Sequence, residues 1–438
     1  MSKSITFIVQ PSLSLNGEIR VPGDKSMSHR SIMLGSLAEG VTHVEGFLNA
    51  KDAMSTLKAF RAMGVEITDP IEGKVTIKGV GKHGLKAPKE PLDLGNSGTS
   101  MRLLSGLLAG QDFDCTLTGD ESLSSRPMRR VTDPLALMGA QIETQADGSA
   151  PLHIKGTTQL NSIKYTLPMA SAQVKSCLLL AGMYATGETS ITEPAPTRDH
   201  TERMLNGFGY PVKRDGSQAS INNKGTLTAA NIDVPSDISS AAFFLVGASI
   251  AQNSDVTLRH VGMNPTRTGI IDILQLMGAN ISILNPREVG GEPVADLRVV
   301  TSELKGIVIP ESLVPLAIDE FPVLFVAAAC AKGQTILTGA EELRVKECDR
   351  IQVMADGLHT LGVDAQVTED GMIINGGKIG GGQVISHGDH RIAMAFSIAG
   401  LKATAPITIE NCANVNTSFP EFRELATSLG LQLTSNHK

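Results

Sequence analysis

A repeated pattern constrains the fold of this 438-residue chain more than any other feature. A small or polar patch precedes an apolar run, a β-like stretch rich in Thr, Val and Ile, and an amphipathic segment that closes on a Gly. The patches begin near Asp24, Asn96, Ser171, Asp237, Asp319 and Asp389, and the closing glycines are Gly64, Gly139, Gly209, Gly278, Gly362 and Gly430. Their spacing of 66 to 84 residues predicts six similar supersecondary units.

The first unit indicates how each unit folds. Apolar residues at helical spacing, in runs that end at a Gly, predict two helices, and alternating apolar residues predict strands. The expected elements are, in order, a helix at 28–37, a strand at 41–44, a helix at 52–63 and strands at 65–67 and 75–77. We therefore predict an α/β protein of repeated β-α-β-α-β-β-type units, with its helices buried inside the sheets.

The chain is too long for a single hydrophobic core, so two domains of three units each are expected. The third unit ends before the Val-Pro-Ser-Asp segment at 234–237, where the fourth unit begins. We expect one domain at 21–236 and the other at 1–20 plus 237–438, with a single strand at 5–9 in the N-terminal segment.

Composition excludes several classes of function. Aromatic residues make up 3% of the chain, Trp is absent and the net charge is −7, which argues against a surface for nucleic acids. The apolar runs are too short to cross a bilayer and the N-terminus has no apolar signal segment, so we expect no membrane partner. The five scattered cysteines are typical of reduced thiols in a cytoplasmic protein.

Basic residues at the predicted helix starts point to anion binding. The first patch places Lys25 and Arg30 where free N–H groups and the helix dipole already carry positive charge. These cations would destabilise the helix start unless an anion is bound, although for one patch alone a plain cap is an equally good interpretation. Because several patches share this conflict, we predict an enzyme that holds small, multiply anionic substrates.

The next three patches differ in what they offer. The small residues at 95–102 expose backbone N–H groups, and Arg126, beside Pro127, is the better anion ligand of a nearby basic cluster. The third patch, at 169–175, presents hydroxyl, amide and ammonium groups that suit a polyol or a phosphate. The fourth patch, at 236–240, has no cation and is interpreted as mainly structural.

The last two patches bring carboxylates together with cations. Asp319 and Glu320 precede a wholly apolar helix, and Arg391 follows the His-Gly-Asp-His segment at 387–390. The His and Asp residues of that segment could suggest a metal ion. The adjacent Arg and the lack of a further ligand set favour no metal site.

Together these segments resemble the family of 5-enolpyruvylshikimate-3-phosphate (EPSP) synthases, essentially from end to end and most closely in its class II branch. The matching segments are Pro-Gly-Asp-Lys-Ser-Met-Ser-His-Arg, Gly-Asn-Ser-Gly-Thr, Ser-Arg-Pro-Met, Ser-Ala-Gln-Val-Lys, Arg-Asp-His-Thr-Glu, Asn-Pro-Thr-Arg, Arg-Val-Lys-Glu-Cys-Asp-Arg and Gly-Asp-His-Arg. The resemblance implies the two-domain enolpyruvyl transferase fold, with the substrates in the interdomain cleft.

The resemblance also implies a reaction of the shikimate pathway. The 5-hydroxyl of shikimate 3-phosphate would add to C2 of phosphoenolpyruvate while C3 takes a proton, and loss of phosphate would leave an enol ether. This product lies on the route to chorismate and the aromatic amino acids. The resemblance implies no metal or organic cofactor, a monomer, and glyphosate as a candidate inhibitor.

Matching positions carry over the roles of individual residues. Asp319 would be the base at the 5-hydroxyl, Glu347 would exchange the proton at C3, and Lys25 would complete the catalytic set. Shikimate 3-phosphate would be bound by Lys25, Ser26, Arg30, Ser171, Ala172, Gln173, Arg198, Asp319 and Lys346. Phosphoenolpyruvate would be bound by Lys25, Gly98, Arg126, Gln173, Arg350 and Arg391.

The chain departs from the class I enzymes at two points, and one of them is Glu342, where class I has Asn. It lacks the Lys that class I enzymes carry before a C-terminal Thr-Phe-Pro, because here the segment at 417–420 is Thr-Ser-Phe-Pro. Gly98 bears on inhibition: an Ala there would narrow the pocket against glyphosate, and this chain has Gly, so class II membership does not imply tolerance.

Two alternative functions stay open. The sister transferase that acts on UDP-N-acetylglucosamine has Lys-Asn in place of Lys25-Ser26, and usually a reactive Cys in the loop that here is 121–125 and has none. A non-catalytic scaffold of stacked repeats would not need Asp319 and Glu347 among converging cations.

Overall fold

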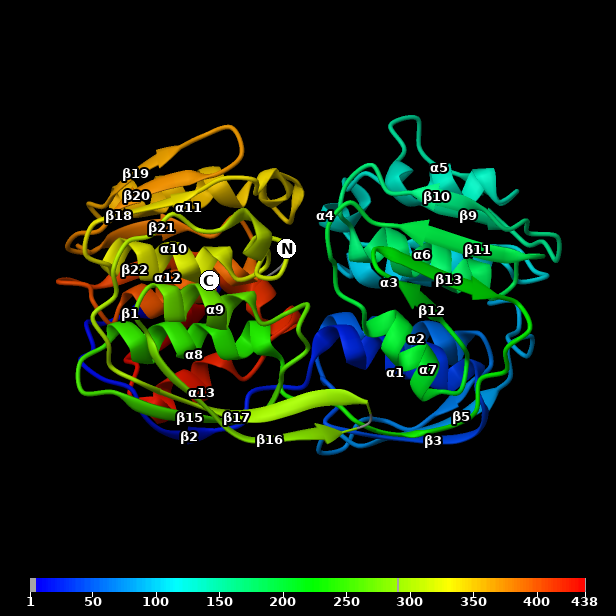
Figure 1. Ribbon diagram of the computed structural model, residues 1–438, viewed down its shortest axis with the longest axis horizontal. Coiled ribbons are helices and arrows are strands. Elements are labelled where there is room, and N and C mark those ends of the chain that lie inside the picture. The colour runs from blue at the N-terminus through cyan, green and yellow to red at the C-terminus, as the bar shows by residue number, and fades with distance from the viewer. Residues whose placement is uncertain (1–4, 290, 438) are drawn as a thin grey trace. The chain divides into compact units, whose positions relative to one another are not determined.

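The computed structural model describes residues 5–289 and 291–437, which fall into two compact units (Figure 1). Unit 1 contains residues 5–22, 235–288 and 292–437, and unit 2 contains residues 23–234 together with Val289 and Gly291. The N-terminal segment forms β1 (Ile5–Val9), as predicted, and also β2 (Asn16–Ile19), which was not predicted. The sequence of β2, Asn-Gly-Glu-Ile, has no apolar alternation, and this strand pairs in parallel with a strand of distant sequence, β15 (Asp255–Gly262).

Within residues 23–234 the strands form three sheets that share one pairing pattern, a parallel pair followed by two antiparallel pairs. The first sheet has the order β14 (Asn231–Asp233), β3 (Glu39–Glu45), β5 (Val75–Val80) and β4 (Glu66–Ile67). The second has the order β6 (Leu92–Asp93), β7 (Cys115–Thr118), β9 (Leu152–Lys155) and β8 (Gln141–Glu143). The third has the order β10 (Lys164–Thr166), β11 (Glu188–Thr192), β13 (Gln218–Asn222) and β12 (Lys213–Asp215).

The described strands of unit 1 also form three sheets. The first has the order β16 (Asn280–Val289), β17 (Glu292–Val300), β15 and β2. The second has the order β18 (Gln334–Leu337), β20 (Met372–Asn375) and β19 (Asp364–Val367), and a parallel bridge between Val308 and Ile336 extends it. The third has the order β21 (Gly382–Ile385), β22 (Ile407–Glu410), β1 and β23 (Leu433–His437).

The helices fall into an inner and an outer set in each unit. The inner helices are α1 (Lys25–Leu37), α3 (Gly98–Ala109) and α6 (Ala172–Gly182) in unit 2, and α8 (Ile238–Ile250), α10 (Phe321–Cys330) and α12 (His390–Ala399) in unit 1. The other helices are α2 (Lys51–Ala62), α4 (Glu121–Ser124), α5 (Arg129–Leu137) and α7 (His200–Gly207) in unit 2, and α9 (Gly269–Leu276), α11 (Arg350–Thr360), α13 (Phe422–Leu429) and the 3-10 helices η1 (Glu311–Leu313), η2 (Glu341–Val345) and η3 (Cys412–Thr417) in unit 1.

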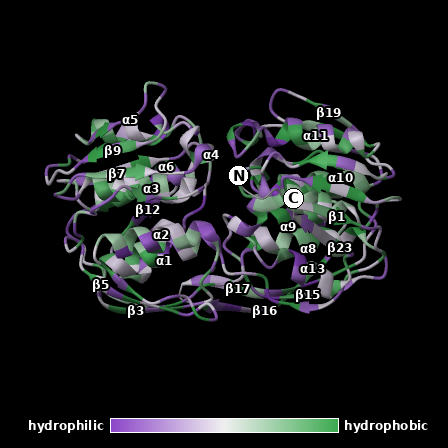
Figure 2. Cartoon of the chain, turned by 180° about the vertical axis from the view of Figure 1, so that it is seen from behind, coloured by the Kyte–Doolittle hydropathy of each residue, from purple (hydrophilic) through white to green (hydrophobic). Residues whose placement is uncertain are grey.

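The inner helices form the core of each unit, which confirms the prediction of helices buried inside the sheets. All 13 residues of α8 are buried, because its run of Ala, Phe, Leu, Val and Ile leaves no polar face for solvent. Hydrophobic colouring runs along α8 and α10 in Figure 2. The helix starts are the polar parts of these otherwise apolar segments, and the patches lie there.

The six closing glycines share one backbone conformation. Gly64, Gly139, Gly209, Gly278, Gly362 and Gly430 all have positive φ angles, between 77° and 121°. A left-handed residue after the last turn ends a helix, and glycine adopts it without steric cost. The spacing of these glycines in the sequence therefore marks the ends of the second helices.

No helix within the described residues is both long and apolar enough to cross a membrane.

Candidate active site

The first patch forms the start of α1. Asp24 caps the helix by accepting a hydrogen bond from the backbone N–H of Met27 at 2.8 Å. The ammonium of Lys25 forms an ion pair with Asp52, near the start of α2, and the Lys25 side chain stays 22% exposed. This carboxylate offsets the repulsion between Lys25 and the helix dipole and leaves the ammonium within reach of solvent.

Arg30 lies deeper than its neighbours in the first patch, with 5% of the residue exposed. Its Nε donates a hydrogen bond to Thr201 Oγ1 at 2.7 Å, and its terminal nitrogens donate to Ser176 Oγ at 3.0 Å and to the backbone carbonyl of Ser26 at 2.9 Å. The guanidinium thus joins the starts of α1, α6 and α7. This predicted shikimate 3-phosphate ligand is also a structural link between three helices.

His29, between these two cations, is a buried neutral group. Its Nδ1 lies 2.7 Å from Thr56 Oγ1 on α2. Burial, assisted by the positive charge of Lys25, lowers the pKa of His29 to about 3. The imidazole therefore adds no positive charge to the first patch at neutral pH.

The second patch forms the start of α3 and brings two arginines to one glycine. Arg126 donates hydrogen bonds to the side-chain oxygen of Asn96 at 2.7 Å and to its backbone carbonyl at 3.3 Å. A Cβ atom placed on Gly98 would lie 3.2 Å from a terminal nitrogen of Arg126 and 3.2 Å from a terminal nitrogen of Arg102. The absence of a side chain at Gly98 is what lets both guanidinium groups approach the start of the helix.

The third patch forms the start of α6, where Ser171 accepts a hydrogen bond from the backbone N–H of Val174 at 3.4 Å. Ala172 and Gln173 follow in the first turn. Arg102 donates a hydrogen bond to Gln173 Oε1 at 2.6 Å, and Gln173 Nε2 donates to Thr99 Oγ1 at 3.2 Å. The structure therefore brings Gly98, Arg126 and Gln173 together around Arg102.

Arg102 is not among the site residues predicted from the sequence. A signal was present, because a residue four positions after Gly98 lies on the same face of a helix. The contact with Gln173 could not be predicted, since it joins two helices that are far apart in the sequence.

The ammonium of the third patch does not belong to a substrate site, which corrects the interpretation of Lys175. Lys175 is fully buried, and its Nζ lies 3.0 Å from Glu193 and 2.9 Å from Glu202. Arg214 reaches the same two carboxylates at 3.3 and 3.2 Å. Unit 2 therefore contains a balanced network of two cations and two carboxylates, in which Arg214 is partly exposed and each of the three buried charges has a partner.

Arg198 lies in the segment between Glu193 and α7 and is half-buried. The hydroxyl of Thr197 donates a hydrogen bond to Glu193 at 2.6 Å, and Asp199 accepts one from Arg203 Nε at 3.0 Å. Both neighbours of Arg198 are thus held in place, one of them by the buried network of Lys175.

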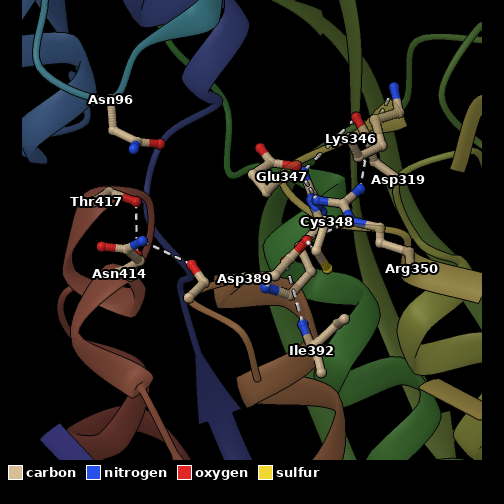
Figure 3. Close-up of polar contacts among 12 residues, drawn as sticks. Asn96, Asp319, Lys346, Glu347, Cys348, Arg350, Asp389, Ile392, Asn414 and Thr417 are labelled. Carbon is tan, nitrogen blue, oxygen red and sulfur yellow. Dashed lines mark hydrogen bonds and ion pairs between the residues drawn. The ribbon is translucent and has the colours of Figure 1, made fainter. Parts of the chain in front are cut away.

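The predicted acid–base residues lie together in unit 1, around one arginine (Figure 3). Arg350, with 1% of its side chain exposed, donates to Asp319 at 3.3 Å, to Glu347 at 2.7 Å and, through Nε, to Asp389 at 2.8 Å. Burial alone would lower the pKa of Arg350, but the three carboxylates outweigh it and raise this pKa well above its usual value. Asp319 and Glu347 are therefore tied to opposite ends of one guanidinium.

Asp389, the carboxylate at which the sixth patch begins, has two roles. Its Oδ1 accepts the backbone N–H of Arg391 at 2.8 Å and so caps α12, while its Oδ2 accepts Arg350 Nε. The nearby thiol of Cys348 lies 3.8 Å from the same oxygen. Burial, followed by the charge of Asp389, raises the pKa of Cys348, so this thiol stays protonated and is no nucleophile.

Two further cations face Asp319. Lys346 Nζ lies 3.7 Å from Asp319 and 3.0 Å from Glu342, and Arg391 lies 3.8 Å from Asp319 and 3.9 Å from Glu320. The five residues predicted in unit 1, Asp319, Lys346, Glu347, Arg350 and Arg391, thus form one cluster of alternating charge.

The fourth patch is connected to this cluster by hydrogen bonds, and the interpretation of it as mainly structural agrees with its burial. The buried Arg267 donates to Asp237 at 2.9 Å and to the hydroxyl of Ser239 at 2.7 Å. That hydroxyl in turn forms a short hydrogen bond to Glu320, beside Asp319. Among the described residues, no group of three or more His, Cys, Asp or Glu side chains is arranged to hold a metal ion.

The chain is similar to known proteins over nearly its whole length. A family model described as "EPSP synthase (3-phosphoshikimate 1-carboxyvinyltransferase)" matches residues 9–425. The chain is 68% identical to a 3-phosphoshikimate 1-carboxyvinyltransferase of Methylococcus capsulatus, over 98% of this chain and 99% of the relative. It is 66% identical to a protein of the same name from Hydrogenovibrio crunogenus, over 99% of both chains.

A solved structure is similar to the chain as well. The EPSP synthase of Acinetobacter baumannii is 59% identical, with a TM-score of 0.89 over 99% of this chain and all of that one.

Proposed function

Because the chain belongs to the EPSP synthase family, we propose that it transfers the enolpyruvyl group of phosphoenolpyruvate to the 5-hydroxyl of shikimate 3-phosphate, with release of phosphate. The observation that carries the proposal is the cluster in which Arg350 holds Asp319 and Glu347 at its two ends. A transfer of this kind needs a base at a hydroxyl and an acid at a carbon, and this cluster offers two carboxylates close together.

The charges of the two units suit the substrates. Each substrate carries a phosphate and a carboxylate, so several cations must converge on it, and arginine forks fit both groups. Unit 2 offers Lys25 and Arg126, and unit 1 offers Arg350, Arg391 and Lys346. We propose that the substrates are bound by residues of both units, with shikimate 3-phosphate and phosphoenolpyruvate held by the residues expected from the sequence.

Asp319 is proposed as the base. The positive charges of Arg350, Lys346 and Arg391 lie within 4 Å of its carboxylate and favour the ionised form that accepts the 5-hydroxyl proton. The same cations stabilise negative charge that develops on the tetrahedral intermediate. Lys25, accessible at the start of α1, would assist from unit 2.

Glu347 is proposed as the acid that protonates C3 of phosphoenolpyruvate. Glu347 forms an ion pair with Arg350 at 2.7 Å, and this positive charge favours the anionic form of the carboxylate. An anionic substrate that binds Arg350 and Arg391 would compete for this positive charge and favour the protonated form of Glu347. Substrate binding would then supply the acid when it is needed.

Phosphate release tests the proposal. The purified chain should release inorganic phosphate when both substrates are present and none when either is omitted. Release with UDP-N-acetylglucosamine in place of shikimate 3-phosphate would support the sister transferase, an alternative that the relatives do not favour. No release under any of these conditions would favour a scaffold.

We further propose that the chain works as a cytoplasmic monomer without a metal or organic cofactor, and that it binds neither nucleic acid nor membrane. Light scattering of the purified protein tests whether it is a monomer. Activity after dialysis against a chelator tests whether it needs a metal ion. An inhibition curve for glyphosate at fixed phosphoenolpyruvate would measure how readily a site with Gly98 admits this inhibitor.

A further inference from the structure

Gln173 is held by α3 in a single orientation. Its Oε1 lies 2.6 Å from a guanidinium nitrogen of Arg102, and its Nε2 lies 3.2 Å from Thr99 Oγ1. A guanidinium has only donors, so the end of the amide that faces Arg102 must be the oxygen. Arg102 therefore decides which end of the Gln173 amide carries the acceptor and which carries the donors.

This orientation has a chemical consequence. A carboxamide nitrogen has two N–H donors, and Thr99 takes one of them, so the second N–H can serve a further acceptor. If the amide were turned over, its oxygen would occupy the position of the N–H donors and would repel a phosphate or a carboxylate. The orientation fixed by Arg102 is the one in which Gln173 can bind an anion.

The position of Arg102 links it to the proposed phosphoenolpyruvate ligands. A Cβ on Gly98 would be 3.2 Å from terminal nitrogens of both Arg102 and Arg126, so the two guanidinium groups meet at the same glycine. Arg126 is anchored there by Asn96, at 2.7 Å. The half-buried Arg102 thus lies beside one predicted ligand and bonds to another.

We propose that Arg102 is a positioning residue for the enolpyruvyl transfer: it keeps the Gln173 amide with its donor end toward the anionic substrate. The inference rests on the proposed function. The inference goes beyond the proposed function because Arg102 acts through Gln173. It also predicts that the reaction needs the N–H donor of Gln173 and not the contact with Arg102 itself.

Two substitutions separate positioning from mere packing. Arg102→Met removes the charged hydrogen bond and frees the amide to turn, which should lower kcat/KM for phosphoenolpyruvate by about 10- to 100-fold, the range of one hydrogen bond to a charged group. Gln173→Glu keeps, and charges, the contact with Arg102 but removes the N–H donors. It should retain or raise the melting temperature and still lower kcat/KM at least as much as Arg102→Met.

A conservative variant and a matched control complete the set. Arg102→Lys retains a donor to Oε1 on a shorter side chain, so its kcat/KM should lie between those of wild type and Arg102→Met. Arg61, on α2 of the same unit, donates to the backbone carbonyl of Ile67 at 2.6 Å and pairs with Asp69. Arg61→Met should leave kcat/KM at the wild-type value.

The outcomes distinguish this inference from the proposed function. A wild-type chain that released no phosphate from its two substrates would overturn both. An active wild type together with near-normal kcat/KM in Gln173→Glu or in Arg102→Met would overturn the inference alone. If Arg102→Met does not fold, Gln173→Glu still decides, because a stable and active Gln173→Glu would show that the amide donor is not required.

Discussion

Replacing Lys175 by Met should lower the free energy of unfolding of unit 2 by about 3 kcal/mol, the lower part of the range for breaking a buried ion pair. The ammonium lies 3.0 and 2.9 Å from Glu193 and Glu202, and the side chains of all three residues are at most 2% exposed. Met fills much of the same volume, so the loss is chiefly electrostatic. Arg214 still reaches both carboxylates and limits the loss, but its side chain is 33% exposed and therefore partly screened.

Thermal unfolding followed by far-UV circular dichroism measures this effect, since the chain contains no Trp. For a unit of roughly 200 residues, 1 kcal/mol corresponds to about 2–4 °C, so the melting temperature should fall by about 6–12 °C. Adding Glu193→Gln and Glu202→Gln to Lys175→Met should restore most of the loss, because no carboxylate is then left without its partner.

A control and a contrary result sharpen the prediction. Lys78 and Glu66 form an ion pair of 2.6 Å in the same unit, but both side chains are largely exposed, so Lys78→Met should unfold like the wild type. The reasoning would be refuted if Lys175→Met kept its melting temperature and instead raised KM for shikimate 3-phosphate. The ammonium would then be a substrate ligand, as the sequence pattern alone suggested.

Three further predictions concern catalysis and pH. Asp319→Asn should lower kcat by roughly 10²-fold or more, as expected for loss of a general base; steady-state phosphate release measures this, and a near-normal rate would contradict the assignment. Lys25→Met should reduce kcat/KM far more than it reduces the melting temperature, because the ammonium is partly exposed; the reverse pattern would indicate a structural lysine. His29 has a folded-state pKa of about 3 against an ordinary value of 6.5, so only the unfolded chain takes up this proton between those values. Stability should be full above pH 6.5 and should fall by about 2 kcal/mol by pH 5; urea unfolding should show a shallower loss in His29→Asn, and an equal slope would argue against a neutral buried imidazole.

Features that depend on neighbours in the sequence could be predicted. The closing glycines mark helix ends because a left-handed residue acts on the turn directly before it, and all six have positive φ. Apolar runs such as α8 and α10 predicted buried helices for the same local reason. Likewise, the motif segments identified the family, which the relatives and the solved structure confirm.

Features that depend on partners far along the chain could not. A short strand such as β2 carries no pattern of its own and exists because β15 pairs with it. The ammonium of Lys175 looked like a ligand in its motif, and only the approach of Glu193 and Glu202 makes it an interior charge.

The sequence by itself thus determined the α/β architecture with its buried helices and the family. Only the tertiary structure decided which charged side chains pair with one another in the interior and which form a common cluster. Arg102 meets Gln173 across two helices, and Asp389 meets Arg350 across 39 residues of sequence. The physical reason is that helix ends follow from local backbone sterics, whereas hydrogen bonds and ion pairs act over a few ångströms in space and have no fixed separation in sequence.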